Sequence, residues 1–167
     1  MLRPYFEWVD ALPSSIALRE STYGYTFLLT THVLSMCVFA GLVIMMDLRL
    51  AGFGNKGTPI SEIQKRLFPW QTLGMVGAAI TGVLLFYGQP MRYYGKVFYW
   101  SKIAMMILAL LNLLYFHLGT YRSVAQWDTN TTPPMNVRLA GIISLVLWAG
   151  VVATGRLTAY DWLTYRP

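Results

Sequence analysis

Residues 30–50 read TTHVLSMCVFAGLVIMMDLRL, a segment that is apolar almost throughout. It carries His32 near one end and Asp47-Leu48-Arg49 at the other. About 20 apolar residues in succession are what an α-helix needs to cross a hydrocarbon core of about 30 Å. The segment therefore predicts a transmembrane helix. It also raises the question of why an apolar helix contains one of only two histidines in the chain.

The composition of the whole chain indicates a membrane protein. Of its 167 residues, 56% are hydrophobic and 12% are charged, and the mean hydropathy is +0.47. A soluble domain of this size has more charged side chains on its surface. Four segments are long and apolar enough to span a membrane: 25–46, 70–87, 98–118 and 137–154. We therefore predict an all-α, polytopic four-helix bundle that forms one domain over residues 1–167.

The charge pattern indicates contact with a lipid bilayer rather than with nucleic acid. The formal net charge is +6, and the isoelectric point is about 9.6. The basic residues stand at the ends of the apolar segments, as headgroup contacts and topology signals do. They divide almost evenly between the two sides, and the pair Lys65 and Arg66 in the first loop favours termini outside. The opening residues lack the pattern of a cleavable signal peptide, so we expect the first helix to direct insertion.

The segments outside the spans are amphipathic, polar or rich in turn residues. Residues 4–20 mix aromatic and charged side chains and predict an N-terminal amphipathic segment at the membrane interface, broken at Leu12-Pro13. Residues 51–69 read as a polar connector with one helical turn at 60–67. Residues 88–96 form a short link, and Pro133-Pro134 precedes the last span because proline is not expected inside it.

His32 has two interpretations. An ionisable side chain inside a span costs at least about 2.5 kcal/mol at the centre, so it needs a partner or a function. A neutral imidazole that donates to a carbonyl or a threonine hydroxyl would serve packing alone. Alternatively, His32 is an axial ligand of a b-type haem, which an apolar bundle holds without covalent attachment. Small residues on the helices would give a flat macrocycle room, although each also fits ordinary close helix packing: Gly41, Gly74, Gly77, Ala78, Gly82, Gly141 and Gly150.

His117 lies near the far end of the third span, and that span runs parallel to the first. At 1.5 Å per residue the depths of His32 and His117 differ by about 15 to 20 Å. One haem held by both histidines of the same chain is therefore disfavoured. The spacing favours two sites at different depths, with further ligands from elsewhere or from a neighbouring subunit.

Other polar residues complete the set of candidates. Arginines near the ends of the spans are candidate partners of haem propionates or other cofactor contacts: Arg49, Arg92, Arg122 and Arg156. Asp47 is expected to form an ion pair with Arg122 or Lys65, and Asn112 to hydrogen-bond a neighbouring helix. Lys102 is interpreted as a snorkelling side chain. No arrangement of serine, cysteine or carboxylates suggests hydrolysis.

Some of these motifs occur together in a known group of proteins. They are HVLSMCVFAGLVIMMDLRLAG from residue 32, RLFPW from 66, TG and LLF within 81–86, and FYWSKIAMMILALLNLLYFH from 98. The chain resembles an uncharacterised family of small four-helix bacterial inner-membrane proteins with histidines in the first and third helices. The resemblance implies a multi-pass protein of the bacterial inner (plasma) membrane. It marks these positions for testing: His32, Asp47, Arg49, Lys102, Asn112 and His117.

A more general resemblance is to small membrane b-type cytochromes, which have few histidines, all of them buried. Two bis-histidine haems need four histidines, whereas this chain has two. The resemblance therefore implies a homo-oligomer or a redox partner protein that completes the ligation.

We expect a membrane protein that binds haem b through His32 and His117. It would pass electrons between a membrane quinol and another redox protein, without itself making bonds on a substrate. Two alternatives stay open. One is a non-redox structural or accessory membrane subunit whose histidines serve packing. The other is a copper(I)-binding protein that uses His32 with the thioether of Met36, four residues on.

Overall fold

The computed structural model describes residues 3–54, 57–129 and 132–160. These residues are mostly helical, which confirms the predicted all-α class. The elements are, in order, α1 (Arg3–Asp10), α2 (Pro13–Glu20), α3 (Thr22–Leu50), α4 (Ile60–Gly88), α5 (Pro90–Tyr94), α6 (Val97–Leu118), the 3-10 helix η1 (Thr120–Gln126) and α7 (Met135–Leu157).

Helices α3, α4, α6 and α7 are long and apolar enough to cross a membrane. They contain 29, 29, 22 and 23 residues, so even the shortest is about 33 Å long at 1.5 Å per residue. Large apolar side chains are exposed along their outer faces, among them Val33, Ile80, Leu111 and Val146. Such a surface suits a hydrocarbon environment, and the chain is accordingly a multi-pass membrane protein.

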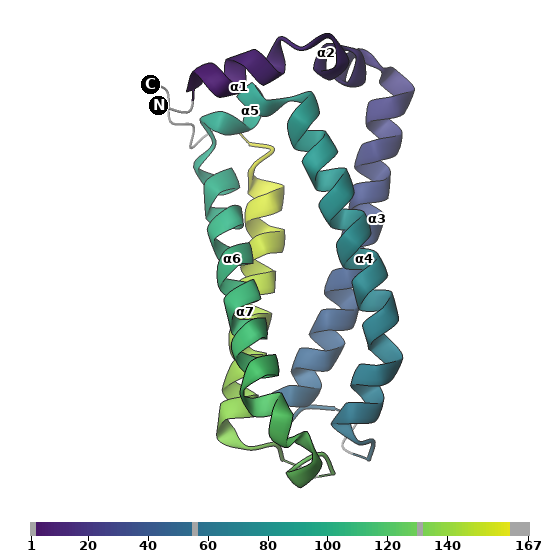
Figure 1. Cartoon of the computed structure of the whole chain (residues 1–167), viewed down its shortest axis with the longest axis vertical. Helices are drawn as coiled ribbons and strands as arrows, with labels where there is room; N and C mark the ends of the chain where they lie inside the picture. The colour runs from purple at the N-terminus through teal and green to yellow at the C-terminus, as the bar shows by residue number, and fades with distance from the viewer. Residues whose placement is uncertain (1–2, 55–56, 130–131, 161–167) are drawn as a thin grey trace.

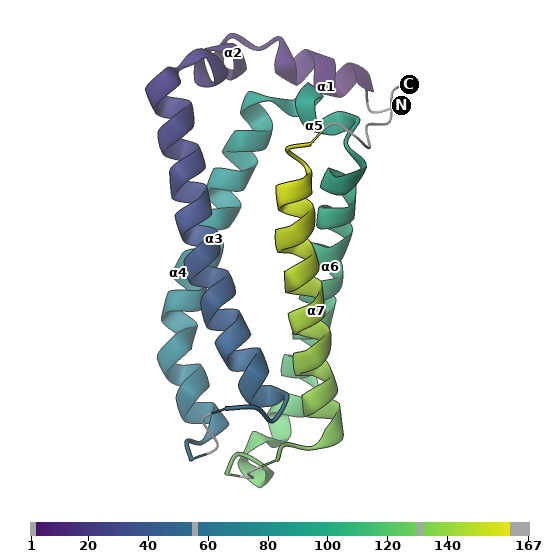
Figure 2. The ribbon, with the colours of Figure 1, turned by 180° about the vertical axis from the view of Figure 1, so that it is seen from behind.

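The bundle consists of two antiparallel hairpins. Helix α3 packs along α4, and α6 packs along α7 (Figure 1). Contacts between α3 and α7 join the hairpins, whereas α4 and α6 hardly touch each other. Figures 1 and 2 show the hairpins close together at the end where α3 passes into the loop before α4, and farther apart at the end where α1 and α2 lie. We call these the loop end and the terminal end.

The N-terminal segment lies across the terminal end (Figure 2). The predicted amphipathic stretch forms α1 and α2, and the chain breaks between them. Phe6 is buried and packs against Phe86 and Tyr94, with ring centroids 5.6 and 5.0 Å apart. The hydroxyl of the fully buried Ser15 donates to the Tyr87 carbonyl at 2.8 Å. These contacts fasten α1 and α2 to the end of α4.

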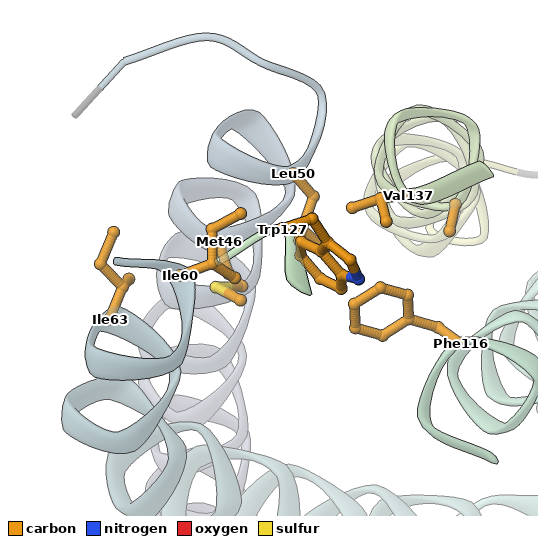
Figure 3. Packing of buried hydrophobic residues seen from close by; sticks show 8 residues of the cluster. Met46, Leu50, Ile60, Ile63, Phe116, Trp127 and Val137 are labelled. Atoms are coloured by element: carbon orange, nitrogen blue, oxygen red, sulfur yellow. The ribbon is translucent and has the colours of Figure 1, made fainter. Parts of the chain in front are cut away.

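A hydrophobic cluster fills the loop end (Figure 3). Its buried members come from α3, α4, α6, α7 and the segment after η1: Met46, Leu50, Ile60, Ile63, Phe116, Trp127, Val137 and Ala140. Trp127 is only 5% exposed, and its indole N–H donates to the Ser123 hydroxyl at 3.2 Å. A buried indole needs such an acceptor. The cluster holds the two hairpins together at this end.

Helix α4 begins ten residues before the predicted span, at Ile60 instead of residue 70. The single helical turn expected at 60–67 is in fact the start of this helix, which continues through Pro69. The reason lies in Ile60 and Ile63, which are buried in the loop-end cluster and hold the segment against the bundle. Helix α7 begins directly after Pro134, as the proline pair predicts.

Candidate functional site

His32 faces α4 across a close helix contact. Its Nδ1 lies 2.9 Å from the hydroxyl oxygen of the buried Thr81. That hydroxyl donates its one proton to the Gly77 carbonyl at 2.6 Å, so toward His32 it acts as an acceptor. Nδ1 therefore carries the proton of the neutral imidazole, and Nε2 keeps the lone pair. This tautomer is the one that a metal bound at Nε2 requires.

Gly82 gives the imidazole its place against α4. A Cβ added at Gly82 would lie 3.1 Å from Cε1 of His32, closer than ordinary van der Waals contact. The glycine thus allows the ring to approach the helix backbone while Thr81 holds it. In the sequence Thr81 stands out only as part of the short Thr-Gly motif, because its contact with His32 spans 49 residues.

Four of the glycines expected to make room for a macrocycle have neighbouring helices packed against them. A Cβ at Gly74 would meet the Phe39 backbone nitrogen at 2.9 Å, and one at Gly141 would meet the Asp47 carbonyl oxygen at 2.8 Å. Gly77 and Gly150 are faced by side chains of Ser35 and Met105. Gly41 has nothing within 4 Å of its added Cβ. A planar cofactor therefore finds no room at these four glycines.

Lys102 turns toward the inside of the bundle. The position that a Cβ on Gly155 of α7 would take lies 3.8 Å from its Nζ, and the side chain is partly buried. Its ammonium group thus lies against α7 close to the terminal end of that helix, which is compatible with the snorkelling interpretation.

A cavity of about 550 Å³ occupies the loop-end half of the bundle. Residues of α3, α4, α6 and α7 line it, and most of them are apolar. The polar side chains of its lining are Asp47, Gln64, Gln71, Thr72, Asn112, His117 and Ser144. The hydrophobic cluster of Figure 3 closes its loop end through Met46, Leu50 and Phe116. Its size is that of a small-molecule site, typically 300 to about 1,000 Å³.

His117 lines this cavity, whereas His32 does not. Nδ1 of His117 lies 3.3 Å from the Leu113 carbonyl oxygen, and only a protonated nitrogen can bond there, so the neutral imidazole has its lone pair on Nε2. The ring stacks on Tyr121 with centroids 5.3 Å apart. Burial, and then the nearby Asp128 carboxylate, raise the pKa of Tyr121, so its hydroxyl stays protonated. The two histidines thus belong to separate regions of the bundle.

Asp47 is buried at the loop end, with 6% of its surface exposed. The expected ion pair with Arg122 or Lys65 is not found in the described part of the chain. Its carboxyl lies instead near the hydroxyl of Ser144 on α7. The second oxygen, Oδ2, is buried without a hydrogen-bond partner. A buried carboxylate oxygen left in this state is unusual and favours a ligand or water at that point.

Comparison with known protein families identifies the family of this chain. A model for a family of unknown function, DUF6644, matches residues 5–161. The chain belongs to the DUF6644 family. Searches of curated proteins and of solved structures found no significant match.

In this DUF6644 chain the four candidate arginines lie away from the cavity. Arg49 is buried at the end of α3, and its guanidinium donates to the Thr58 carbonyl at 3.3 Å. Arg122 is exposed on η1. Arg92 donates to the Gln89 side chain at 2.9 Å, and Arg156 lies 6.0 Å from the centre of the Tyr160 ring. The structure brings none of them to His32 or His117 by a described contact.

Metal-ligand clusters are absent from residues 3–54, 57–129 and 132–160: no three His, Cys, Asp or Glu side chains come together there. A site built on one imidazole is not affected by that finding. The copper(I) hypothesis, which pairs His32 with Met36, stays a prediction.

Proposed function

We propose that this DUF6644 protein is a b-type haem protein of the bacterial inner membrane that mediates electron transfer, with His32 as a ligand of the iron. The observation that supports the proposal is the state of His32. Thr81 holds its Nδ1–H inside an apolar helix, and Nε2 is left as an electron-pair donor. Metal-bound histidines characteristically donate their other ring N–H in this way.

The haem would lie beside Nε2 of His32, in the terminal-end half of the bundle. Lys102 supplies a cation on the α6 side for a propionate. The haem supplies one-electron redox chemistry. The protein contributes ligation, a low dielectric and this charge. Because His117 faces another region, the second axial ligand comes from a second copy of the chain or from a redox partner protein.

The test is a reduced-minus-oxidised absorbance spectrum with a pyridine haemochrome assay on detergent-purified full-length protein. We expect a b-type spectrum that is lost in His32→Ala and retained in His117→Ala. Helical content measured by circular dichroism controls for folding. A spectrum lost in both variants, or in neither, would contradict the assignment of His32.

A structural or accessory membrane subunit is the second candidate, and a specific observation favours it. The bond to Thr81 by itself accounts for a half-buried neutral histidine, and neighbouring helices fill most of the glycine faces. In that case protein from haem-replete cells is colourless. His32→Gln then folds and assembles like the wild-type chain.

The proposed orientation places both termini outside. In a Cys37→Ser background, single cysteines at Thr58 in the first loop and at Ser14 in α2 can be labelled in intact cells with a membrane-impermeant maleimide. Labelling at position 14 alone supports the orientation, and labelling at position 58 alone reverses it.

A further inference from the structure

We propose that the loop-end cavity binds the aromatic headgroup of a membrane quinol, with Asp47 Oδ2 and His117 Nε2 as the acceptors of its two hydroxyl groups. The inference rests on the proposed electron-transfer function and names its reductant and the residues that hold it. The cavity lies within the membrane spans and is lined mainly by apolar side chains.

Two of the polar side chains that line the cavity offer acceptors. Asp47 lines it, and its Oδ2 is buried without a hydrogen-bond partner. In the neutral His117 imidazole Nδ1–H is directed to the Leu113 carbonyl, and Nε2 has the lone pair. A ligand that fits them must donate two hydrogen bonds, and a hydroquinone does so through its two O–H groups. Such a ligand would satisfy Asp47 Oδ2, the one buried carboxylate oxygen of the described residues that has no hydrogen-bond partner.

The lining also favours an aromatic ring over a phospholipid. Phe39, Phe68, Phe116 and Trp148 present ring surfaces to the cavity. Phe39 and Trp148 meet edge to face, with centroids 4.7 Å apart, an arrangement that favours a further aromatic partner. No lysine or arginine is among the described lining residues, so a phosphate headgroup would find no cation there.

The route from the bilayer lies between α4 and α6. These helices hardly contact each other, and both contribute side chains to the cavity (Figure 1). An isoprenoid tail can pass between them into the lipid while the headgroup lies near Asp47 and His117. Quinols reach their sites from within the membrane, so such an opening is what they need.

The proposed acceptors take up all the protons and electrons that the quinol releases on oxidation. A quinol that is oxidised to the quinone loses two electrons and two protons. The protons pass to Asp47 Oδ2 and His117 Nε2. The haem proposed at His32 would supply the one-electron acceptor for each of the two electrons. Phe39, at the inner end of the cavity, is seven residues from His32 on α3, about 10 Å along the helix axis.

The test measures binding of short-chain ubiquinol, with one isoprene unit, to the full-length protein in lipid nanodiscs under anaerobic conditions. Isothermal titration calorimetry with empty nanodiscs as the baseline gives the affinity. Ala109 is buried and lines the cavity, so Ala109→Phe should fill it and weaken binding at least about tenfold. Ala104→Phe, on an exposed part of the same helix, is the matched control and should bind like the wild-type chain.

Asp47→Asn tests the hydrogen-bond assignment. The substitution replaces one carboxylate oxygen by an amide nitrogen and so turns an acceptor into a donor. We expect quinol binding to weaken about tenfold, whereas binding of the oxidised quinone is retained. If this variant does not fold, the comparison of Ala109→Phe with Ala104→Phe decides alone.

His32→Ala separates the failure of this inference from the failure of the haem assignment. This variant loses haem but should bind the quinol with unchanged affinity. Equal quinol binding by the wild-type chain and Ala109→Phe would overturn the inference, because it would show partitioning into lipid. A phospholipid that native mass spectrometry finds in the wild-type cavity, and that excess quinol does not displace, would also overturn it.

Discussion

The hydrogen-bond partners of polar side chains in the membrane spans can be predicted from the sequence in some cases, as Asn112 and Asp47 show. Asn112 was expected to bond a neighbouring helix, and its amide donates to the Ala140 carbonyl of α7 at 3.0 Å. A polar group in hydrocarbon has to find such a partner, so the prediction needed no tertiary information. Asp47 was different. A charged partner was expected, but none is found in the described part of the chain, and Oδ2 is buried without a hydrogen-bond partner.

Substitution of Gly82 tests the placement of the His32 imidazole against α4. Gly82→Ala puts a Cβ within 3.1 Å of the imidazole, and the ring has to shift away from Thr81. We expect haem occupancy in the purified protein to fall about tenfold, the lower end of the effect typical for loss of a metal ligand's orienting partner. The haemochrome assay measures it.

Gly41→Ala is the matched control, because its added Cβ meets nothing within 4 Å. Haem occupancy should stay at the wild-type value, and thermal stability should rise slightly, by up to about 1 kcal/mol. Equal occupancy in both variants would show that the contact between His32 and Gly82 does not position the ligand.

Hydropathy did not predict where helix α4 begins. The first turns of α4 contain Glu62, Lys65 and Arg66 and precede Pro69, so composition placed them in a loop. The helix forms there because Ile60 and Ile63 are buried and because the chain after η1 satisfies its first donors. Asp128 accepts from the Ser61 backbone N–H at 2.8 Å and also bonds the Ser61 hydroxyl. That cap comes from 67 residues away, which no local pattern can reveal.

The cap predicts a stability effect. Asp128→Ala removes both acceptors of Ser61, and the start of α4 loses its side-chain cap. We expect a loss of about 1 to 2 kcal/mol in the free energy of unfolding, the usual range for capping residues. Thermal unfolding in a mild detergent, followed by circular dichroism, measures it.

Glu7→Ala is a suitable comparison. It removes an exposed ion pair with Arg3 in α1, and such pairs contribute little. Its unfolding temperature should stay within experimental error of the wild-type value. If Asp128→Ala also unfolds at the wild-type temperature, the cap is not a stabilising feature of α4.

For the whole molecule, length and composition were sufficient to predict an all-α chain with four membrane-spanning helices, because a bilayer allows few alternatives. The cavity could not be predicted in the same way. It depends on two hairpins that meet through α3 and α7 while α4 and α6 stay apart. The side chains that face it, such as Gln64 and Ser144, lie on different helices and share no motif. The sequence placed His32 and His117 at different depths, but only the packing shows that one is held against α4 and the other lines a cavity.

Electron transfer from the quinol to the haem can be tested directly by one absorbance measurement. Purified full-length protein is oxidised, made anaerobic and mixed with short-chain ubiquinol, and the haem absorbance is followed over time. We expect reduction of the haem in the wild-type chain and in Ala104→Phe, and at least about tenfold slower reduction in Ala109→Phe. A haem that dithionite reduces but ubiquinol leaves ferric, or equal rates in the two phenylalanine variants, would contradict it.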